Sequence, residues 1–165
     1  MQSENCYSQE EFNLFNPAYC GVLIYEAIRQ YQSIDPGGMH CLLPYLVIPM
    51  STSSEICHLL PSSTRSPLAG WAVDNEGSLI SLAEMAASFM PIVDQAIYFL
   101  FEKKAISISE GGCFAIQDGA IAANPILIKS NKNSLLNYKS AGFIGRWFAA
   151  TSSVENIFAH LGVKP

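Results

Sequence analysis

The longest apolar stretch of the chain, residues 79–101, is followed by a change in hydrophobic period. It contains two charged residues, so we expect a helix with most of its surface buried. Over residues 105–117, apolar and polar positions then alternate about Gly111-Gly112, as in a β-hairpin. A helical block followed directly by a two-stranded hairpin predicts a winged-helix-like unit.

A helix is predicted from Pro17 to about Gln32, because Asn16 can cap its free N–H groups and proline is favoured at the first position. Residues 35–38, Asp-Pro-Gly-Gly, stop it. Residues 45–48 lie between two prolines and favour a short buried strand or an extended segment.

Two short helices are expected next. Thr52 with Glu55 has the spacing of a capping box for a helix to Leu60. Ser66-Pro67 predicts the start of another helix through Trp71.

The long apolar block is expected to begin at Ser78, or at Ser81 with Glu84 three residues on. Pro91 costs about 3 kcal/mol inside a helix, so it should kink the block or start a second helix. After the hairpin, residues 119–131 have the composition of a loop, where residues 126–128 could add a strand.

The C-terminal part predicts a helical pair. The first helix, residues 134–150, places Ala141, Gly145 and Ala149 on one stripe, where another backbone could approach closely. The bulk of this helix comes from Phe143, Trp147 and Phe148. Ser152 with Glu155 opens the second helix, and Gly162 ends it.

We therefore predict a helix-rich α+β fold, winged-helix-like, with one small β-hairpin. Residues 1–15 form a lead-in, and residues 16–165 form a single domain. Within it we separate a helical half (16–77), the central helices with the hairpin (78–118), and the C-terminal helical pair (132–161).

Charged residues make up 14% of the chain, against about 25% in typical soluble domains. We interpret the shortfall as surface that another protein covers; an ordinary domain rich in Ser, Asn and Gln is the alternative. Residues 1–102 hold two basic and eleven acidic side chains, and residues 103–165 hold seven basic and three acidic ones. The C-terminal part could therefore contact phosphates or an acidic partner, whereas the net charge of the N-terminal part would repel them.

The five cysteines have no paired spacing, and the first residues lack the pattern of a signal peptide. We expect reduced thiols and a cytoplasmic protein. The longest uncharged run, residues 36–54, contains three prolines, so we do not expect it to span a membrane.

No motif in the chain predicts a catalytic, cofactor or metal site, and we expect no enzyme activity. His40-Cys41 and Cys57-His58 could suggest zinc, but zinc ligands usually come as spaced pairs. A Cys–His hydrolase would need a third orienting group, which no local signature marks. Gly111-Gly112 and the Gly142/Gly145 pair lack the context of phosphate loops.

Four segments together resemble a known family. They are Asn16-Pro17-Ala18, Leu60-Pro61 with Ser63-Thr64-Arg65, Gly142–Phe148, and Ile157–Pro165. In this order and spacing they resemble the small middle component of bacterial three-component ABC-ATPase systems, a group that includes Lamassu anti-phage and anti-plasmid defence. The resemblance covers nearly the whole chain from Phe15 to Pro165.

The resemblance implies an accessory adaptor subunit without catalysis of its own. Its partners would be an SMC- or Rad50-like ATPase, which binds the ATP and senses DNA, and an effector, often a nuclease. The interface or structural candidates are Arg65, Gly142, Gly145, Arg146, Trp147 and Phe148. For Arg146 we expect stacking on Trp147 and an internal ion pair. Lys103 and Lys104 are candidate phosphate contacts, so that DNA would be bound weakly or through the ATPase.

The alternatives come from other classes. A stand-alone winged-helix DNA-binding regulator needs a basic recognition helix, yet residues 66–102 contain no Lys or Arg. An enzyme would need a constellation that the sequence does not offer.

Overall fold

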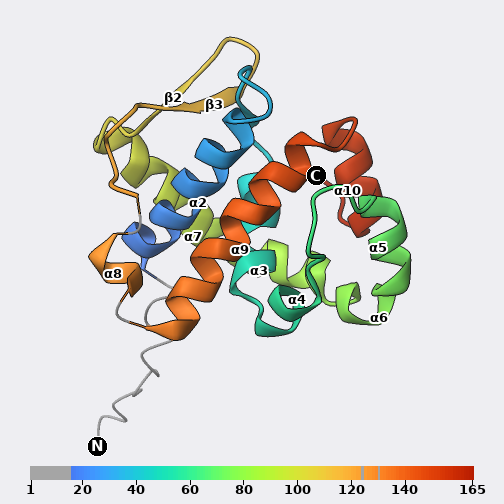
Figure 1. Ribbon diagram of the computed structural model, residues 1–165. Helices are drawn as coiled ribbons and strands as arrows, with labels where there is room; N and C mark the ends of the chain where they lie inside the picture. Colours follow the sequence, from blue (N-terminus) through green and yellow to red (C-terminus); the bar gives the residue numbers. More distant parts are fainter. Residues whose placement is uncertain (1–15, 124, 130) are drawn as a thin grey trace, which may run out of the picture.

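The computed structural model describes residues 16–123, 125–129 and 131–165; the predicted lead-in at 1–15 lies outside them. Helices dominate and a small antiparallel sheet covers one end of them, so the α+β prediction is confirmed (Figure 1). The helices are α2 (Pro17–Gln32), α3 (Pro44–Thr52), α4 (Ser54–Leu59), α5 (Leu68–Asp74), α6 (Glu76–Leu79), α7 (Leu82–Glu102), α8 (Ile126–Lys129), α9 (Lys132–Ala149) and α10 (Val154–Leu161). The strands are β1 (Met39–His40), β2 (Ile106–Ile108) and β3 (Cys113–Ile116).

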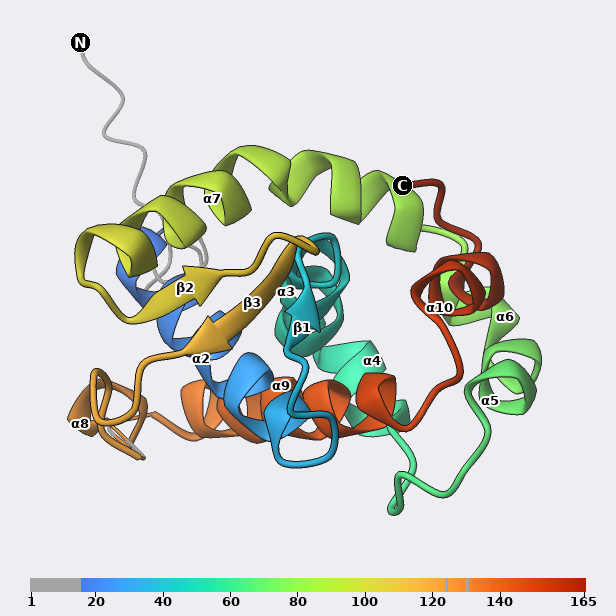
Figure 2. The ribbon, with the colours of Figure 1, turned by 90° about the horizontal axis from the view of Figure 1, so that it is seen from above.

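Helix α2 lies at the centre and has the predicted ends. The Asn16 side chain accepts a hydrogen bond from the Ala18 N–H at 2.9 Å, which satisfies one of the free donors of the first turn. Both α2 and α3 contact α7 on one side and α9 on the other. Figure 2 shows α7 and α9 on opposite sides of the molecule, with α2, α3 and the sheet between them.

The predicted hairpin is confirmed. Ile106 pairs with Ile116 and Ile108 pairs with Phe114, and Gly112 takes a φ of +75°, which favours glycine, in the turn. A third strand, β1, pairs with β3 and gives the order β1-β3-β2. The strand suggested at 126–128 is wrong, because these residues belong to the short helix α8.

The strand or extended segment predicted at 45–48 is also wrong, since α3 covers these residues. Leu46, Val47 and Ile48 are all fully buried, as α3 is enclosed by α2, α7 and α9. A helix buried on every side shows no apolar period, so its pattern cannot be told from that of a buried strand. Pro44 occupies the first turn of α3, and Pro49 lies inside the helix.

Two helix starts are one residue later than predicted. Ser53 rather than Thr52 caps α4, accepting from the Ile56 N–H at 3.3 Å. Ser153 rather than Ser152 caps α10 in the same way. In both places neighbouring hydroxyl residues could serve, and the one with extended backbone angles becomes the cap.

Two other predicted caps form no side-chain bond. The sequence predicts Ser66 as the cap of a helix that begins with Pro67, but Pro67 itself takes the cap position and α5 begins at Leu68 without a side-chain cap. Ser81 precedes α7 as expected and supplies no capping bond. Helix α7 continues through Pro91, so the alternative of a second helix is wrong; Figure 2 shows one curved helix.

Candidate interaction surfaces

The small residues of α9 pack against α2. A Cβ added to Gly145 would lie 2.2 Å from the carbonyl oxygen of Ala27 and 3.0 Å from its Cα. A Cβ on Gly142 would lie 3.1 Å from a carboxylate oxygen of Glu26. The close approach expected for this stripe is confirmed, and its partner is a helix of the same chain.

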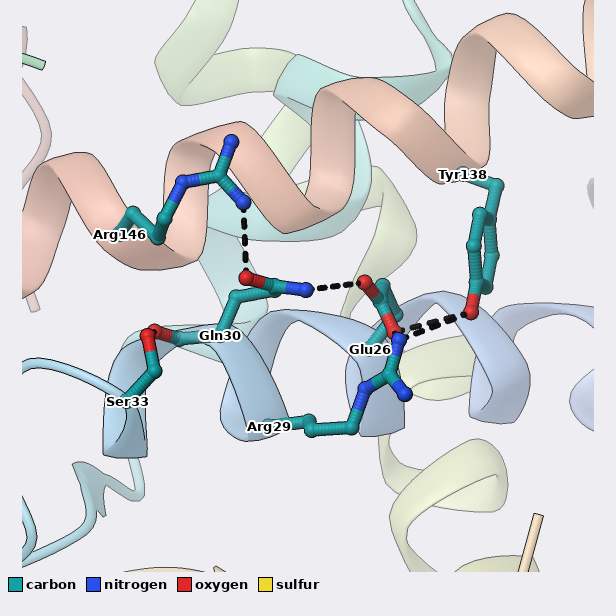
Figure 3. A network of polar contacts seen from close by, with 6 residues as sticks. All are labelled: Glu26, Arg29, Gln30, Ser33, Tyr138 and Arg146. Atoms are coloured by element: carbon teal, nitrogen blue, oxygen red, sulfur yellow. Dashed lines mark hydrogen bonds and ion pairs between the residues drawn. The ribbon is translucent and has the colours of Figure 1, made fainter. Parts of the chain in front are cut away.

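A buried polar network crosses the same contact (Figure 3). Glu26 of α2 is 5% exposed and forms an ion pair with Arg29. Its carboxylate accepts hydrogen bonds from the Tyr138 hydroxyl at 2.9 Å and the Gln30 side chain at 2.8 Å. A buried carboxylate needs such partners to offset its desolvation, so the network fixes the register of α2 on α9.

Sequence reasoning missed this network, although one signal was available. Glu26 is the single acidic residue of α2, and Arg29 follows three residues later on the same helix. That spacing places the two side chains side by side. Their partners on α9 are separated from them by more than a hundred residues, and no local pattern indicates them.

Arg146 extends the network toward the surface. Its Nη1 donates to the Gln30 side-chain oxygen at 2.8 Å, and Figure 3 shows the other terminal amino group directed away from Gln30. The internal ion pair expected for Arg146 is wrong: among the described residues the ion pair found here joins Arg29 to Glu26. Glu26 is already satisfied by nearer donors, so a neutral amide bridges it to Arg146.

Trp147 and Phe148 are core residues, 1% and 0% exposed. The Trp147 indole N–H donates to the Ser66 carbonyl at 2.7 Å, and its ring packs edge-on against Trp71 with centroids 5.1 Å apart. The Trp71 indole in turn donates to the Leu59 carbonyl at 2.7 Å. The two tryptophans therefore hold both ends of the turn over residues 60–66.

Arg65 is exposed on that turn. The turn, the end of α9 and α10 together line a polar groove of about 240 Å³ that includes Thr64, Arg65, Trp147, Thr151 and His160. Three of the four segments that carry the family resemblance thus meet around one groove.

Helix α7 has two unlike faces. Leu82, Val93 and Leu100 are buried toward α2 and α3, whereas Met90, Tyr98 and Phe101 are exposed. We define the outer α7 face as the exposed residues that share one side of the helix by their spacing: Ala83, Ala87, Met90, Asp94, Tyr98 and Phe101. The prediction that most of this helix is buried is therefore wrong for the chain by itself.

A groove of about 270 Å³ runs beside the first half of the outer α7 face. Its other walls are the start of α3, Phe158 of α10 and the C-terminal residues Val163–Pro165. The Tyr45 hydroxyl donates to Asp94 in the middle of the face, and burial beside that carboxylate raises the pKa of Tyr45 to about 12. Tyr45 therefore keeps its proton, and its role as donor, at mildly alkaline as well as neutral pH.

By length and composition alone, the stretch Glu76–Glu102 could also cross a membrane, and 28% of its most apolar window is buried in the structure. The buried share lies on the side that packs against α2 and α3. The outer α7 face lies within the part that is not buried.

Lys103 and Lys104 are exposed, as predicted, between α7 and the hairpin. The Lys103 ammonium lies 5.7 Å from the ring centre of Phe99. Lys104 has a φ of +53° and turns the chain from helix into strand.

No cluster of three or more potential metal ligands occurs among residues 16–123, 125–129 and 131–165. The Cys57 thiol donates to the Ser51 carbonyl at 3.1 Å, and burial raises its pKa. Burial raises the pKa of Cys20 to about 12. Neither thiol is an available thiolate at neutral pH, and only a thiolate would bind a metal or attack a substrate.

The model of the ABC-three component (ABC-3C) system Middle Component 3 family matches residues 5–165. The chain belongs to this family. No curated protein and no solved structure matches it. Membership makes the chain an accessory middle component of a multi-component ABC-ATPase system, with protein partners. In this middle component, the outer α7 face exposes large apolar side chains, and the Arg65 groove exposes an arginine.

Proposed function

We propose that this middle component is a non-catalytic adaptor that joins an SMC- or Rad50-like ATPase to an effector, of which a nuclease is the kind we expect. It would act in the cytoplasm, in Lamassu-like defence against phages and plasmids, with ATP bound by the ATPase. The family match supports the accessory role. The observation that carries the adaptor role is the outer α7 face.

The outer α7 face fits an apolar helix of the ATPase subunit. Its exposed side chains follow steps of three and four residues along a helix of 21 residues, the spacing that a second helix needs for packing. Met90 and Tyr98 are 50% and 66% exposed and can act as anchors. Asp94 on the face, with exposed Glu84 and Glu102 beside it, makes this side of α7 acidic, so the partner helix should carry basic residues beside its apolar ones.

The second contact would use the Arg65 groove. The turn is held from below by Trp147 and Trp71, so Arg65 can be presented at little cost in conformational entropy. A guanidinium in a polar groove favours a carboxylate. We therefore assign the Arg65 groove to an acidic segment of the effector.

We also interpret α7, the hairpin and β1 as a winged-helix-like unit whose outer helix serves protein contact. Such a unit could instead belong to a DNA-binding regulator. The acidic outer α7 face does not favour that function, since a duplex repels carboxylates.

Copurification tests the ATPase contact. The tagged middle component would be coexpressed with the ATPase subunit as wild type, as Met90→Glu, and as Val73→Glu. Val73 is a matched control, because it is an apolar helix residue that is 75% exposed on α5. We expect Met90→Glu to weaken binding by about 30-fold or more, the size of a hot-spot loss, and Val73→Glu to leave it unchanged. Equal binding by all three proteins would show that the ATPase does not bind the outer α7 face.

The effector contact has its own test. In the three-component assembly, Arg65→Glu should release the effector and retain the ATPase. Release of both partners, or of neither, would contradict the assignment of the Arg65 groove.

A further inference from the structure

Helix α9 carries a row of basic side chains on the side of the molecule away from α7. Lys132, Lys139 and Arg146 are seven residues apart, so they lie along one side of the helix with about 10.5 Å between neighbours. Lys132 and Lys139 are exposed and Arg146 is half-buried. We call these three residues the α9 row.

The sequence around the α9 row contains no acid. Residues 119–154 hold Lys129 and the α9 row but no Asp or Glu, although the whole chain has a net charge of −5. The acid that lies against α9 from α2 is Glu26, which is buried and paired with Arg29. The positive charge of the row is therefore not cancelled by its own helix or by that neighbour.

The row is also held on a rigid support. Gly145 and Gly142 bring α9 onto the backbone and side chains of α2, and the Glu26 network ties the two helices together. Gln30 orients Arg146 through one of its terminal amino groups. A fixed row of cations loses less entropy on binding a regular polyanion than cations on a loop would.

The side chains exposed on α9 favour a duplex nucleic acid over a protein as the partner. Along α9, all of whose residues are described, no large apolar side chain is exposed. A protein interface needs such anchors at its centre, and a single-stranded nucleic acid needs exposed aromatic rings for stacking. Phosphates of a duplex need neither, since lysine and arginine side chains suffice.

We propose that the α9 row binds the sugar–phosphate backbone of double-stranded DNA without sequence preference. Helix α9, which carries the row, lies on the opposite side of the molecule from α7 (Figure 2), so this contact does not depend on the ATPase docking at α7. It takes the place of the contact that the sequence predicts at Lys103 and Lys104, which follow the end of α7, so the loss of those two lysines should leave DNA binding unchanged.

Fluorescence anisotropy of the full chain with labelled duplex DNA, over a range of salt, tests the proposal. The test variant is Lys132→Gln/Lys139→Gln. The matched control is Lys103→Gln/Lys104→Gln, which removes the same charge from two other exposed lysines. Each phosphate contact raises the affinity about eightfold at 0.1 M salt relative to 1 M salt. The test variant loses two such contacts, so at 0.1 M salt it should bind roughly 60-fold more weakly than wild type. The control should bind DNA as tightly as wild type does. In a plot of log K against log salt concentration, the slope should be steeper for the control than for the test variant by about 1.8.

Melting temperatures of all three proteins check the fold, and Lys139→Gln alone replaces the double variant if that one is unstable. The single variant should then bind about eightfold more weakly. Absence of DNA binding by the wild type, or a loss only in the control, would overturn the proposal. Labelled poly-glutamate provides the remaining comparison. If it binds the row more tightly than DNA does, the partner is an acidic protein and the DNA assignment is wrong.

Discussion

The contact of Gly145 with Ala27 gives the sharpest prediction about stability. In Gly145→Ala, the new methyl group would lie 2.2 Å from a carbonyl oxygen, 2.9 Å from the carbonyl carbon and 3.0 Å from the Cα. All three atoms are backbone, so no side chain can rotate away. Restoring a distance of 3.0 Å from the oxygen would require α2 and α9 to separate locally by about 0.8 Å.

Two opposing effects set the size of the change. Alanine is favoured over glycine inside a helix by about 1 kcal/mol. Overpacking a close contact costs about 1–3 kcal/mol, and we take the upper end because the neighbour is backbone. The free energy of unfolding should therefore fall by about 2 kcal/mol for Gly145→Ala, and by more for Gly145→Leu.

Calorimetry on the isolated chain measures this change. At about 2–4 °C per kcal/mol for a domain of this size, Gly145→Ala should melt about 4–8 °C below wild type. Gly70→Ala is the matched control: Gly70 is an exposed residue of helix α5, and a Cβ there meets nothing within 4 Å. That variant should melt about 2–4 °C higher, from helix propensity alone. Gly145→Ala melting at or above wild type would refute the close-packing explanation.

The fold also has consequences for Trp147, for the cysteines and for the outer α7 face. Trp147→Phe removes the hydrogen bond to the Ser66 carbonyl, so the free energy of unfolding in a urea titration should fall by about 1–3 kcal/mol. An unchanged unfolding midpoint would contradict the role of Trp147 in holding the turn. In native protein, a maleimide should modify the partly exposed Cys41 and Cys113 before the buried Cys20 and Cys57, and mass spectrometry showing the reverse order would contradict the burial pattern. The chain purified without its partners should self-associate through the outer α7 face, and light scattering should show that Met90→Glu makes it monomeric. A monodisperse wild-type monomer would count against that face as an interface.

Local signals predicted the elements with strong boundaries. Asn16-Pro17 and the glycines after α2 set its ends, and Gly111-Gly112 set the hairpin. Prediction failed where burial was complete. Leu46, Val47 and Ile48 are enclosed on all sides by other helices, and only tertiary contacts decide between helix and strand for such a segment. Strand β1 has two residues, which is too short for a periodic pattern.

The interaction surfaces were predicted in part. The shortage of charge indicated a covered surface, and the apolar residues of α7 were visible in the sequence. Which side of α7 faces outward depends on how α2 and α3 pack against it, and the sequence does not state that. Gly145 shows the converse case, since its spacing predicted a close contact while the partner, Ala27, lies more than a hundred residues away.

Hydrogen–deuterium exchange of the middle component, alone and in complex with the ATPase subunit of its ABC-three component system, tests the adaptor proposal most directly. We predict that amide exchange slows on binding across residues 82–102, which contain the outer α7 face, and stays unchanged in α9. Stable binding with unchanged exchange over residues 82–102, and protection on another surface, would contradict the proposal.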